Sequence, residues 1–330
     1  MTDFTTSRRA LLAGAAALAA LPVRAATIAA PAISATARDT YARATVIDSL
    51  GGPGSQSDQP DHGFSTRSLN DAHASGITAC NVTVSLVGNG PETFEGTIAN
   101  IAAYNREIAQ HPDVFMAIRN AADLKTAKAS GRLGLIYGLQ DSALLGNSFD
   151  RLDTLDALGV RIAQPTYNLR NLAGDGATEP ANGGLSKFGF AYIAELNKRR
   201  ILVDLSHAGQ RTIAEGIVAS KAPPAITHTG CRALVDHPRN VGDAELKALA
   251  DKAKQLKERR VQQLGELVIA TGADATDAET LAGALLVIAE SSDAQKKEAW
   301  RKRGAAFFQS KARKRGDGPQ SQPDGTLPLC

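Results

Sequence analysis

Two histidines, His207 and His228, each follow a short apolar run of the sequence. The runs cover residues 201–205 and 225–227, and the stretch between them has room for a helix over about residues 210–220. This pattern predicts a strand–helix–strand unit with a histidine at the carboxyl end of both strands, where α/β proteins bind ligands and metals. Neutral imidazoles from neighbouring strands can share one divalent metal ion, most often zinc. The alternative interpretation is that both are ordinary histidines that end their strands.

The elements that must position this pair are strands and helices that alternate from Tyr41 onward. Strands are predicted near residues 45–47, 77–86, 114–118, 133–139, 159–164, 201–205 and 225–227. Helices are predicted between them, among others over residues 92–110, 149–158 and 187–198. Such alternation indicates an α/β fold with a parallel sheet, and this number of strands favours a (β/α)8 TIM-type barrel over a doubly wound sheet.

The composition bounds the class of protein. With 330 residues, 43% hydrophobic and 22% charged, the chain suits one large globular domain, alone or with a smaller one. The formal net charge of +3 is too small to indicate a nucleic-acid or membrane partner for the whole chain. The cysteines, Cys80, Cys231 and Cys330, are odd in number and form no CxxC pair, which argues against a disulfide framework or a cysteine zinc site. Because Cys231 closely follows His228, it is either a soft metal ligand or a plain buried thiol.

Residues 1–26 are predicted to be a twin-arginine signal peptide and not part of the fold. Arg8 and Arg9 precede an alanine- and leucine-rich run, and Ala25 ends a plausible cleavage site. The run is too short to span a bilayer comfortably, and an uncleaved N-terminal anchor is the alternative. Export by this route carries folded cargo to the periplasm, which suits a protein that acquires its cofactor in the cytoplasm. Residues 27–39, rich in Ala, Pro, Ser and Thr, are predicted to be a linker.

The middle of the chain carries an ordered set of short motifs. They are Gly159-Val160-Arg161-Ile162-Ala163-Gln164-Pro165-Thr166-Tyr167-Asn168, Gly184-Leu185-Ser186-Lys187-Phe188-Gly189, Val203-Asp204-Leu205-Ser206-His207, Thr227-His228-Thr229 and His237-Pro238-Arg239-Asn240. In this order the set closely resembles the membrane dipeptidase family, the metallopeptidases called M19, over about residues 42–250. The resemblance implies a TIM-barrel fold, a pair of zinc ions and the cleavage of dipeptides. Residues 40–242 lack the family's last strands, so we expect an incomplete barrel.

The resemblance implies roles for four residues. His207 and His228 match the family histidines that bind the second zinc ion. Arg239 matches the arginine that pairs with the substrate carboxylate, a role that suits a planar, two-pronged donor. Tyr167 falls where the family usually has a substrate-facing histidine.

The sequence departs from the family at its other ligand positions. The family's His-x-Asp pair after the first strand falls at Leu50 and Gly52, neither of which can ligate a metal. The bridging glutamate falls at Gln140, a neutral residue with a single oxygen, and Asp141 lies beside it. We therefore expect at most one zinc ion per chain, where the family has two. Asp141 is the candidate general base or third ligand.

Residues 243–315 leave the dipeptidase pattern and are predicted to be helical. Asp243 caps a long helix that ends at Gly272, and two more helices are expected over about residues 277–290 and 293–309. The motifs of this segment are Glu245-Leu246-Lys247-Ala248-Leu249-Ala250-Asp251-Lys252, Gln263-Leu264-Gly265-Glu266-Leu267 and Gly304-Ala305-Ala306-Phe307-Phe308. They resemble small TraD-type conjugal-transfer accessory proteins, which implies a link to plasmid DNA processing. The basic clusters at 252–260 and 311–315 are either a nucleic-acid contact or a solvated helix face.

Two functions follow from the sequence. The first is a metal-dependent, dipeptidase-like hydrolase of dipeptides or small amides, impaired by the lost ligands. In it, a metal held by His207 and His228 activates water, and Arg239 holds the substrate carboxylate. The alternative is a non-catalytic barrel remnant fused to a helical, nucleic-acid-associated module. No stretch predicts a membrane span, and residues 316–330 are predicted to be disordered.

Overall fold

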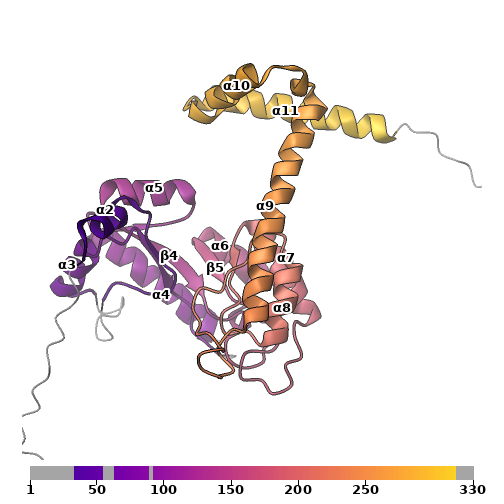
Figure 1. Cartoon of the computed structure of the whole chain (residues 1–330). Coiled ribbons are helices and arrows are strands. Elements are labelled where there is room, and N and C mark those ends of the chain that lie inside the picture. The colour runs from indigo at the N-terminus through magenta and orange to yellow at the C-terminus, as the bar shows by residue number, and fades with distance from the viewer. Residues whose placement is uncertain (1–32, 55–62, 89–91, 317–330) are drawn as a thin grey trace, which may run out of the picture. The chain divides into compact units, whose positions relative to one another are not determined.

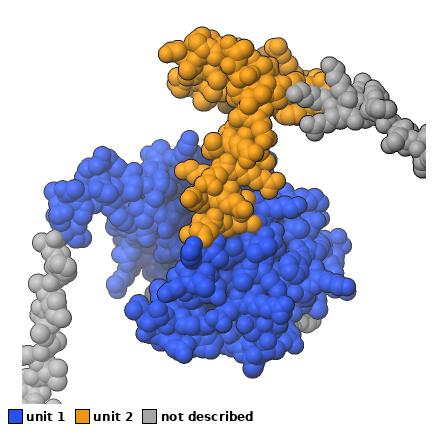
Figure 2. Space-filling view, turned by 45° about the vertical axis from the view of Figure 1, so that its right-hand side comes forward, with its two compact units in different colours: residues 1–249 blue, residues 250–330 orange. Residues whose placement is uncertain are grey.

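The computed structural model describes residues 33–54, 63–88 and 92–316 (Figure 1). The predicted signal peptide lies outside these residues, as does the predicted tail beyond Gly316. The chain divides into two compact units, residues 1–249 and 250–330 (Figure 2). The boundary falls inside a helix that begins at Asp243, where the sequence predicts the barrel to end.

The first unit contains a six-stranded parallel sheet, curled with its helices around it (Figure 1). Its strands are β1 (Ile47–Asp48), β2 (Ala79–Thr83), β3 (Phe115–Ala117), β4 (Leu133–Leu139), β5 (Val160–Ala163) and β6 (Leu202–Val203). The order across the sheet is β1-β2-β4-β5-β6, and β3 pairs with the beginning of β4. Because all pairs are parallel, the carboxyl ends of the strands lie at one rim. The predicted incomplete (β/α)8 TIM-type barrel is confirmed.

Helices connect the strands, and polar caps fix where several of them begin. They are α2 (Ala35–Arg43), α3 (Thr66–Ala74), α4 (Glu92–Gln110), α5 (Ala121–Ser130), α6 (Asp150–Ala157), α7 (Lys187–Arg199) and α8 (Gln210–Ala219), with a 3-10 turn, η1, at Ala143–Leu145. Ser34, Ser65 and Ser186 each accept a hydrogen bond from a backbone N–H of the first helical turn. Asn120 and Asp123 form a capping box at the start of α5. These bonds satisfy donors that the first turn leaves free.

The main core lies between the sheet and the helices that cover its outer face. Alternate strand residues such as Val82, Leu135 and Val203 point to this face and are almost fully buried. They share a hydrophobic cluster with buried residues of α4, α6, α7 and α8, among them Ile101, Leu155, Leu196 and Ile217. Burying one such side chain contributes about 1.5–3 kcal/mol. This packing fixes the rim at which the functional residues lie.

Most predicted elements of the first unit are present. β4 and α4 have the predicted bounds, whereas the other strands are shorter than predicted. The expected strand at 225–227 is not formed, and Ala225 makes only an isolated parallel bridge with Asp204. Two prolines precede Ala225 and offer no N–H, so the ladder cannot extend in that direction. The predicted linker at 27–39 overlaps α2, so residues 35–39 are helical where the sequence analysis places a linker.

The second unit continues α9 (Asp243–Thr271) and contains η2 (Ala273–Ala275), α10 (Ala278–Glu290) and α11 (Ala294–Gly316). α9 has its predicted bounds and is followed by Gly272 in the left-handed conformation, with φ of 77°. α11 continues past its predicted end at residue 309. Several basic residues pair with acids one turn away, as in Lys254–Glu258, Lys296–Asp293 and Arg301–Glu298. Such pairs are typical of a solvated helix face. Within the described ranges, no helix has the length and apolarity that a membrane span requires.

Candidate functional site

The structure brings His207 and His228 together at the carboxyl rim of the sheet. Their ring centroids lie 4.8 Å apart in an edge-to-face arrangement, with 61° between the ring planes. The backbone of His207 has a φ of 63°, in the left-handed region that few residues other than glycine occupy. The carbonyl of His207 accepts a 2.7 Å hydrogen bond from the N–H of Ala177, which helps to hold this unfavourable conformation. The pair predicted from the sequence therefore shares one site.

Tyr167 and Asn168, on the loop after β5, contact His207. The ring of Tyr167 stacks on the imidazole, with 4.0 Å between the centroids and 26° between the planes. The side-chain oxygen of Asn168 lies 2.7 Å from Nδ1 of His207. Tyr167 thus lies beside the histidine pair. The contact of Asn168 is one that sequence reasoning missed, and its only signal is its place at the end of the motif that begins at Gly159.

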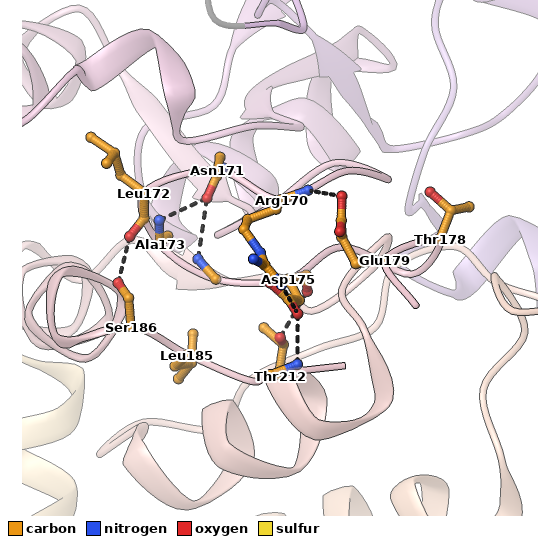
Figure 3. Close-up of polar contacts among 12 residues, drawn as sticks. Arg170, Asn171, Leu172, Ala173, Asp175, Thr178, Glu179, Leu185, Ser186 and Thr212 are labelled. Atoms are coloured by element: carbon orange, nitrogen blue, oxygen red, sulfur yellow. Dashed lines mark hydrogen bonds and ion pairs between the residues drawn. The ribbon is translucent and has the colours of Figure 1, made fainter. Parts of the chain in front are cut away.

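A polar network pins the loop that carries these two residues (Figure 3). The guanidinium of Arg170 holds the buried carboxylate of Asp175 with two hydrogen bonds, of 2.6 Å and 3.0 Å. The hydroxyl of Thr212, on α8, donates to the carbonyl of Asp175 at 2.7 Å. Ser186, the cap of α7, donates to the carbonyl of Leu172. The hydrogen bonds from Arg170 hold the pKa of the Asp175 carboxyl below its usual range.

Arg239 lies against the histidine pair. Its Nε–H donates to Nδ1 of His207 at 3.0 Å, and its Nη2 donates to the carbonyl of His228 at 2.8 Å. A planar cation at this place suits the carboxylate of a small substrate. The oxygen of Asn168 requires a proton on Nδ1 of His207, whereas the N–H of Arg239 requires a lone pair there. The imidazole can therefore satisfy only one of these two partners at a time.

Burial and charge keep both imidazoles neutral at neutral pH. Burial, together with the positive charge of Arg239, lowers the pKa of His207 to about 3. Burial also lowers the pKa of His228, against the opposing effect of the Asp204 carboxylate. The neutral imidazole is the form that ligates a metal ion.

Asp204, which follows β6, is fully buried next to the pair. Its carboxylate accepts a 2.7 Å hydrogen bond from the hydroxyl of Thr227 and a 2.8 Å bond from the side-chain amide of Gln164. The carboxylate thereby joins the segments that follow β5 and β6 to the segment that carries His228. Sequence reasoning gave Asp204 and Thr227 no role of their own. The available signal was a charged residue inside an apolar strand, which indicates a buried polar site.

Asp141 stands apart from the histidines in its contacts. Its carboxylate accepts hydrogen bonds from the side chain of Asn171 at 2.7 Å and from the N–H of Ala143 at 3.0 Å. Burial raises the pKa of Asp141, and these donors oppose the rise. In the described part of the chain, no three His, Cys, Asp or Glu side chains are grouped so that they could hold a metal ion. The structure thus does not bring Asp141 to the pair as a third ligand. Cys231 is exposed, so it is not a buried thiol, and it belongs to no such group of three described side chains.

The site fits one metal ion better than two. Nε2 of His228 is buried and has no hydrogen-bond partner among the described residues. Gln164 Oε1 and Thr166 Oγ1, which follow β5, are likewise buried and unpartnered in that part of the chain. A buried imidazole nitrogen without a partner, next to a second neutral imidazole, suits a metal ion. The positions that the resemblance assigns to the first-strand ligands hold Leu50 and Gly52, whose side chains offer no ligand for a second ion.

Comparisons with known proteins divide the chain near residue 250, as the two compact units of the structure do. Residues 62–254 match the family model of membrane dipeptidase, peptidase family M19, and residues 251–310 match that of the conjugal transfer protein TraD. Dipeptidase verJ of Clonostachys rogersoniana is 30% identical over 160 residues, which are 48% of this chain and 41% of that protein. Dipeptidase aclJ of Aspergillus oryzae is 32% identical over 164 residues, which are 48% of this chain and 39% of that protein. The chain thus spans about two fifths of the length of these relatives.

A solved structure shows the same relationship. The amidohydrolase from Pseudomonas aeruginosa is 35% identical to this chain, with a TM-score of 0.58, over 65% of this chain and 62% of that one. The dipeptidase model covers more than half of the chain and includes the histidine pair, Arg239 and the pinned loop. The chain therefore belongs to the membrane dipeptidase family, peptidase family M19.

Proposed function

We propose that this protein hydrolyses dipeptides or small amides with one metal ion held by His207 and His228. The observation that carries the proposal is the pair of neutral imidazoles 4.8 Å apart, with the guanidinium of Arg239 against them. The curated relatives described above are dipeptidases by name, which supports the substrate class. Zinc is the metal we expect, since two imidazoles with oxygen ligands suit it.

In this proposal, different residues of the site bind the metal ion and the substrate. His207 and His228 hold the metal ion, which when bound supplies Lewis acidity and a water of lowered pKa. Arg239 binds the substrate carboxylate and so places the scissile bond beside the two imidazoles. Tyr167 stacks on His207 and lines the same side of the site. Because catalytic zinc usually has three protein ligands, we expect weak zinc binding and slow turnover.

Metal analysis of the purified protein, paired with a dipeptide hydrolysis assay, tests the proposal. We expect one zinc ion or fewer per chain and a low activity that rises when zinc is added. His207→Ala should remove both. His73→Ala is the matched control, because His73 is an exposed histidine on α3 outside the site, and it should change neither. Two zinc ions per chain would contradict the single-metal site, and metal binding untouched by His207→Ala would place the site elsewhere.

A non-catalytic remnant is the second candidate, and the incomplete ligand set favours it. The first-strand ligands are absent from the sequence, and the described residues hold no group of three potential ligands. The same experiment separates the two candidates. A protein that is folded by circular dichroism, binds no zinc and hydrolyses no dipeptide at added zinc is a remnant.

We further propose that the protein is exported to the periplasm by the twin-arginine route. The support is the Arg8-Arg9 pair before an alanine- and leucine-rich run. Folded export agrees with a site that is assembled from segments far apart in the sequence. Loading with metal would then precede translocation.

A further inference from the structure

The carboxylate of Asp204 is the most heavily bonded buried group near the site. One of its oxygens, Oδ1, accepts from the N–H and hydroxyl of Ser206, at 3.0 Å and 2.7 Å, and from the N–H of Thr227 at 3.1 Å. The other, Oδ2, accepts from the side-chain amide of Gln164 at 2.8 Å and the hydroxyl of Thr227 at 2.7 Å. All five partners are donors. The group therefore acts purely as an acceptor, as an ionised carboxylate does.

The bond to Asp204 fixes the direction of the hydroxyl of Thr227. A hydroxyl has one proton, and here it points to the carboxylate, which has none to give. Oγ1 of Thr227 can therefore only accept from its other neighbour, Nδ1 of His228, at 2.8 Å. The hydroxyl of Ser206 lies 3.3 Å from Oγ1 of Thr227, but it donates its hydrogen bond to Asp204. It therefore does not compete with His228 as a donor to Oγ1.

Nδ1 of His228 must accordingly carry the proton of the neutral ring. Nε2 is then bare, with its lone pair directed away from the threonine. Nε2 is also the buried atom of His228 that lacks a hydrogen-bond partner among the described residues. Nε2 lacks a partner in the described part of the chain whichever nitrogen carries the proton, so the contact with Thr227 decides the tautomer. In the Nδ1–H form this unpartnered atom is a buried acceptor, which a ligand can satisfy.

We propose that Thr227, oriented by Asp204, is a positioning residue that fixes His228 as the Nδ1–H tautomer and keeps Nε2 free to bind a divalent metal ion. The metal-binding part rests on the proposed function, whereas the tautomer does not. The partner of a ligating imidazole sets its tautomer and ring orientation, and its loss typically weakens metal binding by about 10- to 100-fold. A hydroxyl braced by a buried carboxylate is such a partner.

If Thr227 had only a structural role, loss of its hydroxyl would change neither the tautomer nor the metal affinity of a folded protein. The main chain of this segment is tied independently, by the N–H of Thr227 to Asp204 and by Ser49 to the carbonyl of Thr227. Both ties survive Thr227→Val, which keeps the shape of the side chain and removes only the hydroxyl. The valine variant should therefore fold, while the proton of His228 is no longer held on Nδ1. Thr227→Ser restores the hydroxyl and should restore the tautomer.

The first measurement is the tautomer of His228 in the metal-free full chain, from nitrogen-15 NMR of the imidazoles. Loss of a signal in His228→Gln assigns the resonance. We expect the Nδ1–H form in the wild type and in Thr227→Ser, and a shift toward Nε2–H in Thr227→Val. The matched control is Thr229→Val, because the hydroxyl of Thr229 donates to backbone carbonyls and touches no imidazole. It should leave the tautomer unchanged.

The second measurement is zinc affinity by competition with a chromophoric chelator. Thr227→Val should weaken binding by about 10- to 100-fold, whereas Thr227→Ser should stay near the wild type. A wild-type His228 with its proton on Nε2 overturns the inference without any variant, and so does a folded Thr227→Val with unchanged tautomer and affinity. A wild type that binds no zinc refutes the proposed function and the ligand role with it, while the tautomer is still decided by NMR.

Discussion

The hydroxyl of Ser49 donates a 2.6 Å hydrogen bond to the main-chain carbonyl of Thr227, 178 residues further along the chain. Ser49 follows β1, at one edge of the sheet, and Thr227 lies beyond β6, at the other. The bond therefore joins the two ends of the curled sheet at the rim that carries His228. The incomplete barrel thus keeps the segments that follow its first and last strands in contact.

Removing this hydroxyl should loosen the segment of His228 without unfolding the protein. Ser49 is exposed, so Ser49→Ala should lower the free energy of unfolding by about 1 kcal/mol or less. Hydrogen exchange at the N–H of His228, which donates to Ser206, should become faster. Ser75→Ala is a matched control, because the hydroxyl of Ser75 bonds only to nearby backbone at the end of α3. Equal exchange rates in Ser49→Ala and the wild type would show that this bond does not brace the rim.

Replacing Arg239 should separate metal binding from substrate binding. The guanidinium lies at hydrogen-bond distance from His207, so it repels a metal cation and competes with Asn168 for Nδ1. Arg239→Met should tighten zinc binding by about fivefold or more, since unit charges at such distances repel by about 1 kcal/mol or more. It should also raise KM for dipeptides by about 10- to 100-fold, because a charge-assisted hydrogen bond is lost.

Chelator competition and steady-state kinetics measure the two effects of Arg239→Met. Arg211→Met is the control, since Arg211 is a surface arginine of α8 that pairs with Glu215. It should change neither value. Weaker zinc binding in Arg239→Met would show that the arginine supports the metal site instead of opposing it.

Most of the fold could be predicted from the sequence, because the long helices and strands have regular apolar patterns and clear ends. β4 is buried at every residue and α4 has a regular apolar face, so both are predicted with their observed bounds. The segment at 225–227 has the apolar composition of a strand but lacks a second neighbour to pair with. Whether such a run becomes a strand depends on tertiary pairing, which local composition does not contain.

The site was predictable to the extent that it follows strand ends. His207 and His228 each end an apolar run, and parallel strands bring such ends to one rim. The partners of their ring nitrogens were not predictable, because the hydrogen bond between His207 and the side-chain oxygen of Asn168 joins residues 39 positions apart. The side chain of Asp141 is held by Asn171, 30 residues away. Its position after a strand does not show whether this side chain points to the histidines or to Asn171.

The ion pair of Arg170 with Asp175 should make the stability of the pinned loop depend on pH. Arg170 holds the pKa of Asp175 below its usual range, so the stabilisation is complete above the unfolded pKa of about 4. It is lost as the pH falls through the lower folded pKa. The difference in free energy of unfolding between wild type and Arg170→Met should therefore be largest near neutral pH and shrink below about pH 4. Urea unfolding at a series of pH values measures it, and a constant difference would exclude the pair as its cause.

Export should depend on the paired arginines of the predicted signal peptide. The twin-arginine route reads two consecutive arginines, so Lys at both Arg8 and Arg9 should retain the protein in the cytoplasm. Arg24→Lys, a change of the same chemistry near the predicted cleavage site, should leave export intact. Fractionation of cells that express each variant provides the measurement. Periplasmic protein from the double lysine variant would rule out the twin-arginine interpretation.

Two substitutions at Asp141 distinguish a metal ligand from a structural group. Asn keeps an acceptor for the amide of Asn171 and the N–H of Ala143, and it removes a charge whose burial is unfavourable. Asp141→Asn should therefore leave the thermal midpoint equal or higher, with zinc affinity unchanged. Asp141→Ala leaves the N–H of Ala143 without an acceptor and removes one of the acceptors of the Asn171 amide, so it should cost about 1–3 kcal/mol. Loss of zinc binding in the folded Asn variant would instead return Asp141 to the metal site, because only a ligand role requires the negative charge.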